Sequence, residues 1–98
     1  MKLSIKNLLK MNTSFNTIET IRTDATITNK SAAYLAACDE FEIEASKFAN
    51  NENLVSRKSA EEVSLAYHKA KSADCEYSVY VAANAAETWL SKAWNNAD

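Results

Sequence analysis

Residues 30–49, KSAAYLAACDEFEIEASKFA, decide the fold of this chain. Their large side chains recur at alternating steps of four and three residues, which places them on one face of an α-helix. The positions on this face are Tyr34, Cys38, Phe41, Ala45 and Phe48. Residues 40–44 alternate between charged and apolar like a strand, but the alanine-rich flanks favour a helix. We therefore predict a helix over residues 30–49, capped by Asn29 or Ser31 and ended by Asn50 and Asn51.

The C-terminal third contains no helix breaker, and the whole chain has no glycine and no proline. Residues 51–58 look like a connection, and Ser59 to Glu62 then has the S-x-x-E pattern of a capping box. Beyond it the apolar face changes side: Val63, Ala66, Ala70, Ala73, Tyr77 and Val81 share one side, and Val79, Ala82, Ala86, Trp89, Leu90 and Ala93 the other. Residues 59–95 form either one helix buried on both sides or two helices joined near residues 72–74. We favour the single long helix, which suits the middle of a bundle.

The N-terminal part has weaker patterns. Residues 2–11 predict a short amphipathic helix, with Lys2, Lys6 and Lys10 aligned on one side. Residues 13–28 are rich in threonine and isoleucine, which favours a strand, but the spacing of their apolar residues fits a helix. We favour the helix, because the stretch has neither a glycine turn nor a partner strand.

These patterns predict one all-α domain over residues 1–98, a compact bundle of three to four helices with a long C-terminal helix. The absence of glycine excludes Rossmann and P-loop phosphate sites. A net charge of −2 argues against a broad basic surface for nucleic acid. No apolar run approaches the ~20 residues of a membrane-spanning helix, and the N-terminus lacks a signal-peptide pattern. We expect a cytoplasmic protein with two reduced, buried cysteines.

The side chains that carry chemistry are few and scattered. His68 is the only histidine, and Cys75, seven residues further on, is too far along a helix to bond to it. Cys75 could react if Lys71 lowered its pKa, although a structural thiol is the favoured interpretation. One histidine and two separate cysteines offer no metal-binding spacing. We therefore expect no catalytic residue, no metal and no cofactor, and a protein that is not an enzyme.

Two charged faces are simple helix surfaces in this interpretation. Asp39, Glu40, Glu42 and Glu44 line the outer side of the third helix, where they can also attract a basic partner. The three N-terminal lysines can contact an anionic membrane, nucleic acid or an acidic partner. Lysines exposed to water on a core-packing helix are the simpler explanation for that stripe.

Aromatic residues gather in the last predicted helix, and Trp and Tyr dominate binding hot spots. Trp89 and Trp94 are five residues apart, so about 140° separates them around a helix. If Trp89 joins the core, Trp94 points elsewhere, either to a partner or, where the helix end frays, back onto the core. We predict a partner-binding surface made of Trp94, Trp89, Tyr80 and Tyr77.

Three functions remain in competition. The favoured one is a small protein-binding module, an inhibitor, adaptor or regulator of a larger protein, of the kind found among phage and mobile-element accessory proteins. The alternative is a structural homo-oligomer, for instance a homodimer, with the alanine-rich C-terminal helix as its seam. The third is a thiol-based sensor or minor enzyme.

Overall fold

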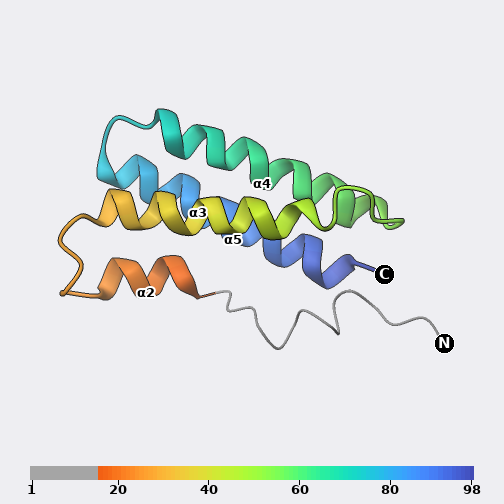
Figure 1. Cartoon of the computed structure of the whole chain (residues 1–98), viewed down its shortest axis with the longest axis horizontal. Helices are drawn as coiled ribbons and strands as arrows, with labels where there is room; N and C mark the ends of the chain where they lie inside the picture. Colours follow the sequence, from red (N-terminus) through yellow and green to blue (C-terminus); the bar gives the residue numbers. More distant parts are fainter. Residues whose placement is uncertain (1–15) are drawn as a thin grey trace.

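The computed structural model describes residues 16–98, which form four helices and no strand. In chain order these are α2 (Thr17–Thr23), α3 (Lys30–Ser46), α4 (Leu54–Ser72) and α5 (Glu76–Asn96). Each helix runs antiparallel to the one before it, and the short α2 lies against α3 and α5 (Figure 1). The predicted all-α bundle with a long C-terminal helix is confirmed. The helix predicted over residues 2–11 and its three lysines lie outside the described residues.

The α3 helix follows the predicted pattern closely. All five positions of the predicted face, Tyr34, Cys38, Phe41, Ala45 and Phe48, are buried. Asn29 is the N-cap, since its Oδ1 accepts a hydrogen bond from the backbone N–H of Ala32 at 3.1 Å. The helix ends at Ser46, and the chain then turns through residues 47–50, with Phe48 still in the core.

The start of α4 differs from the prediction. The helix begins at Leu54, so the connection predicted over residues 51–58 is too long. Asn53 caps it through an Oδ1 that accepts from the Ser56 backbone N–H at 3.1 Å. Ser59 lies inside the helix and is buried, so the capping box predicted at Ser59 is wrong. A local S-x-x-E pattern was outweighed because an asparagine six residues earlier supplies an equivalent acceptor.

Asn53→Ala should lower the free energy of unfolding by about 1 kcal/mol, because the first turn of α4 loses its side-chain acceptor. Urea unfolding measures this change. Asn84→Ala, at an exposed position within α5, is the matched control and should leave the midpoint almost unchanged. Equal midpoints for both variants would show that Asn53 does not cap α4.

The single long helix predicted over residues 59–95 is also wrong. Ala73 and Cys75 adopt extended backbone angles, which end α4 and allow α5 to turn back along it. The reversal explains why the apolar face changes side in the sequence: Val63, Ala66 and Ala70 on α4 and Val79, Ala82 and Ala86 on α5 are all buried. Two antiparallel helices bury these six residues within one chain, whereas one straight helix would need a separate partner for each face.

A buried hydrogen bond fixes the register of this helical hairpin. The hydroxyl of Ser56, which is fully buried, donates to the backbone carbonyl of Ala93 at 2.6 Å. The beginning of α4 is thereby placed beside the end of α5. Because α5 also contacts α2 and α3, it is the most enclosed helix of the bundle.

The α2 helix is attached to α5 by a buried carboxylate. Glu87 accepts hydrogen bonds from the backbone N–H groups of Thr17 at 2.8 Å and Ile18 at 3.5 Å. The buried Ile18 side chain anchors the same turn in the core. Of the helix preferred for residues 13–28, residues 17–23 are confirmed, residues 24–28 are not helical, and residues 13–15 lie outside the described part of the chain. No helix within residues 16–98 has the length and apolarity needed to cross a membrane.

Candidate protein-binding groove

Large apolar side chains that remain exposed gather on α4 and α5. Single exposed apolar residues are ordinary, but a contiguous group marks an interaction surface. Leu65 is 54% exposed on α4, and Val81 is 46% exposed on α5. Within residues 16–98, five of the six exposed large hydrophobic residues belong to these two helices: Leu54, Val55, Leu65, Tyr77 and Val81.

Leu65 and Val81 belong to a groove of about 850 Å³ between α4 and α5, which we call the α4–α5 groove. Its apolar lining is Leu65, Ala66, Ala73, Tyr77, Val81, Ala82, Ala85 and Trp89, and its polar lining is Glu62, His68, Lys69, Ser72, Asp74 and Ser78. On each helix these residues recur at steps of three and four, so the groove follows the helix axes. Alanines between the larger residues leave room for another backbone to approach closely.

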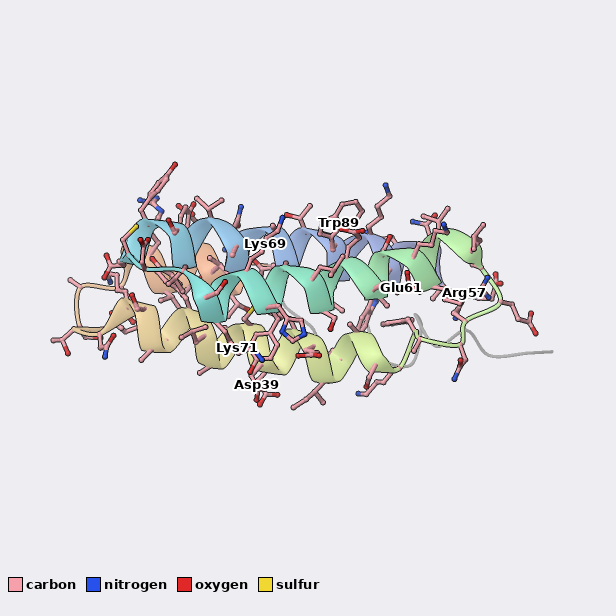
Figure 2. All side chains as sticks on the ribbon, turned by 90° about the horizontal axis from the view of Figure 1, so that it is seen from above. Asp39, Arg57, Glu61, Lys69, Lys71 and Trp89 are labelled. Carbon is pink, nitrogen blue, oxygen red and sulfur yellow. The ribbon has the colours of Figure 1, made fainter. Side chains whose placement is uncertain are left out.

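Trp89 forms part of one wall of the groove. Its side chain is half-buried and points away from α3, on the side of the bundle where Lys69 also projects (Figure 2). The Lys92 ammonium lies 5.2 Å from the centre of the indole ring, a cation–π contact. Trp89, one of the four predicted partner-binding residues, therefore lies on the apolar surface.

Of the two positions left open for Trp94, at a partner or on the core, the structure shows the second, and α5 continues beyond it to Asn96. Its side chain is only 1% exposed, and its ring centre lies 5.8 Å from that of Phe48. Placing Trp94 at a partner assumes that the last helix has only one buried face. Because α5 contacts α2, α3 and α4, it has more than one buried face. Trp94 lies on the face that meets Phe48, in the turn after α3.

Tyr80 and Tyr77 have different surroundings from each other. Tyr80 is half-buried, its hydroxyl donates to Glu19 Oε2 at 3.2 Å, and its ring lies 5.6 Å from Tyr34. These contacts hold α2 and α3 against α5. Tyr77 is 72% exposed at the end of the α4–α5 groove. It also borders a smaller hollow of about 380 Å³, which it shares with Glu19, Arg22, Tyr34, Glu76 and Tyr80.

Of the four predicted residues, Trp89 and Tyr77 therefore line the groove, while Trp94 and Tyr80 pack within the bundle. Sequence reasoning missed Leu65, which is as important to the groove as either aromatic residue. Leu65 lies outside both buried stripes. Once the chain is divided at residues 73–75, a leucine left outside the stripe of α4 is the signal that could have revealed it.

The charged face of α3 is partly engaged within the bundle. Asp39 Oδ1 accepts from the Tyr67 hydroxyl at 3.0 Å, and Glu42 Oε1 accepts from the Ser64 hydroxyl at 3.0 Å. The bond to Asp39 raises the pKa of Tyr67. Of the four acids, Asp39 and Glu40 are exposed, and Glu42 and Glu44 are half-exposed. Two of them therefore connect α3 to α4, and the solvent-exposed face is smaller than predicted.

His68 and the two thiols lie apart from one another. His68 is exposed on α4 and stacks beside Tyr67. Cys38 is buried, also as predicted, and burial raises the pKa of its thiol to about 12. Cys75 is exposed at the N-cap of α5, so the prediction of a second buried thiol is wrong. Within residues 16–98, no group of three or more metal-binding side chains comes together.

The pKa of Cys75 is lowered by a neighbour other than the one considered from sequence. Its Sγ lies 3.2 Å from the Ser78 hydroxyl, and hydrogen bonds from that hydroxyl and the Ser78 backbone N–H lower the thiol pKa. Lys71 is not the cause, because its ammonium lies 4.4 Å above the ring of Tyr67.

The two thiols should therefore react very differently with iodoacetamide. In the native protein we expect Cys75 alone to be alkylated, because Cys38 is buried and its pKa is raised. The Cys75 rate should rise with pH through a midpoint below the ordinary thiol value, and Ser78→Ala should move that midpoint upward. Peptide mass spectrometry follows both sites. Equal native labelling of Cys38 would contradict its burial, and denaturant should make both react.

Comparison with known proteins finds no matching family model, no matching curated protein and no matching solved structure.

Proposed function

We propose that this chain is a small, non-enzymatic protein-interaction module that binds a helix of another polypeptide in the α4–α5 groove. In this function it acts as an inhibitor, adaptor or regulator of the protein that supplies the helix. The observation that carries the proposal is the apolar groove itself, with Leu65, Val81 and Trp89 partly exposed along it.

The shape and lining of the groove support a helix as its occupant. An amphipathic helix presents apolar side chains at steps of three and four, which matches the spacing of the groove walls. Covering exposed apolar surface contributes roughly 25 cal/mol per Å² before the costs of association. Trp89 supplies the aromatic anchor typical of binding hot spots, while Glu62 and Lys69 provide a charged rim.

The positions of the reactive side chains support a binding role over catalysis. Cys38 is enclosed in the core, whereas His68 is exposed on α4 and Cys75 caps α5. Nucleophilic catalysis requires a nucleophile and a base within hydrogen-bond distance of each other. On α4, Glu61 and Glu62 come one turn before Leu65 and Lys69 comes one turn after it. This order of charges favours a second candidate function, a homo-oligomer in which a second copy of the chain fills the groove.

Site-specific photo-crosslinking in the cell that makes the protein tests the proposed function. A benzophenone amino acid replaces Val81 in the groove, and in a control variant it replaces Ile43, which is 52% exposed on α3. We expect a protein adduct from position 81, none from position 43, and loss of the adduct when Leu65→Glu is added. No adduct from position 81, or the same adduct from both positions, would contradict the groove as a docking surface.

A further inference from the structure

On the outer face of α4, the charged side chains one turn before Leu65 are acidic and the charged side chain one turn after it is basic. Residues 61–69 read EEVSLAYHK, so Glu61 and Glu62 precede Leu65 by four and three residues, and His68 and Lys69 follow it by three and four. Residues at these steps share one helix face. A second α4 lying antiparallel on the first, centred on Leu65, would therefore place the acidic pair of each copy opposite Lys69 of the other.

The same centre also relates the apolar residues of α5. The Ser56–Ala93 hydrogen bond sets the register, so Leu65, nine residues after Ser56, lies level with residue 84, nine residues before Ala93. Tyr77 and Trp89 are six residues on either side of residue 83, and Val81 and Ala85 are two on either side of it. A twofold axis near Leu65 thus brings Trp89 of one copy towards Tyr77 of the other, and Val81 towards Ala85.

We propose that the occupant of the α4–α5 groove is the same groove of a second copy of this chain, packed antiparallel about a twofold axis at Leu65. The inference rests on the groove being a docking surface, as in the proposed function, and it takes the second candidate function, the homo-oligomer, in place of a partner of different sequence. The helices α4 and α5 of both copies form a four-helix bundle, with Leu65 and Trp89 in its shared core and Glu62 facing Lys69 across it. Such an interface is isologous: both copies use the same surface, so every contact between two residues occurs twice.

The charges that this dimer uses are available in the single chain. Among residues 16–98, neither Glu62 nor Lys69 forms an ion pair within its own chain. Both lie on the groove side of α4. A twofold axis that lies in the interface and crosses the helix at a right angle leaves this side unchanged. Glu62 of one copy therefore lies on the same side of the interface as Lys69 of the other. An unrelated helix would need its own matching charges, whereas a second copy supplies both signs at the required spacing.

Sedimentation velocity of the full chain over a concentration series tests the proposal. Wild type should form a dimer, and Glu62→Lys or Lys69→Glu should each raise the dimer dissociation constant about tenfold or more, because both symmetry-related pairs become repulsive. The double variant E62K/K69E should dimerise again, since exchanging the two charges restores an attractive pair at both places in the interface. An equimolar mixture of the two single variants should form a heterodimer, because one copy then carries two lysines at these positions and the other two glutamates.

A control variant distinguishes a charge placed in the α4–α5 groove from the general effect of adding a charge to the surface. Leu65→Glu should abolish the dimer, while Ile43→Glu, at a position of similar exposure on α3, should leave it intact. A monomer at every concentration, a dimer unaffected by Glu62→Lys, or failure of the double variant to recover would each overturn the second copy as occupant.

The crosslinked adduct at position 81 distinguishes this failure from that of the proposed function. An adduct with the mass of two copies supports the groove as a docking surface and the dimer, and it contradicts a partner of different sequence. An adduct with a different protein, together with a monomeric wild type, retains the groove as a docking surface and overturns the dimer. A monomeric wild type without any adduct overturns both.

Discussion

Trp94→Ala should lower the free energy of unfolding by about 3–5 kcal/mol, the cost of removing a large aromatic side chain from a packed core. Trp94 is 1% exposed and contacts Phe48, so the substitution leaves a cavity where the end of α5 meets the turn after α3. Urea unfolding followed by far-ultraviolet circular dichroism, at one fixed protein concentration, measures the change.

Trp89→Ala is the matched control, since it removes the same side chain from the same helix. Trp89 is half-buried at the groove, so its removal should cost the monomer less than Trp94→Ala does. The comparison is made in the Leu65→Glu background, because association would otherwise add to the apparent stability. If Trp89→Ala were the more destabilising change, the assignment of Trp94 to the core and Trp89 to the groove would be reversed.

Phe41→Ala should cost a similar amount, about 3–5 kcal/mol, because Phe41 lies on the buried face of α3. It is 6% exposed, whereas Ile43, two residues further along the same helix, is 52% exposed. Ile43→Ala should therefore change the unfolding midpoint far less. The same urea titration serves both variants.

Equal costs for Phe41→Ala and Ile43→Ala would mean that α3 is buried all round. The strand-like alternation of residues 40–44 makes this contrast informative, because neighbours two apart in a strand would share one face. In the helix of the structure they lie on opposite faces. The contrast therefore tests the secondary structure as well as the packing.

The sequence predicts those parts of the fold that depend on periodicity within one helix. The buried face of α3 and its cap at Asn29 follow from spacing and side-chain chemistry alone. The two ends of α4 depend instead on competition between similar signals. Asn53 outweighs Ser59 as the cap, and the chain reverses at residues 73–75 without a glycine or proline. Only the burial of both apolar stripes in one hairpin explains that reversal.

The candidate site was harder to predict because its outline depends on which helices are neighbours. Trp89 and Tyr77 could be named from residue type, but Trp94 has the same chemistry and lies in the core. Leu65 becomes significant only once α5 is known to lie beside α4. The symmetric order of charges about Leu65 is visible in the sequence, but it has meaning only if Glu61, Leu65 and Lys69 are exposed, which the structure establishes.

The most direct test of the α4–α5 groove as the interface is a proton–nitrogen correlation spectrum recorded at increasing protein concentration. The chain has two tryptophans, so it gives two indole N–H signals, one from the groove and one from the core. Trp89→Phe assigns them by removing one. We predict that the Trp89 signal shifts with concentration, that the Trp94 signal stays in place, and that Leu65→Glu abolishes the shift. A Trp89 signal that does not respond to concentration, or a Trp94 signal that moves as far, would contradict dimerisation through the α4–α5 groove.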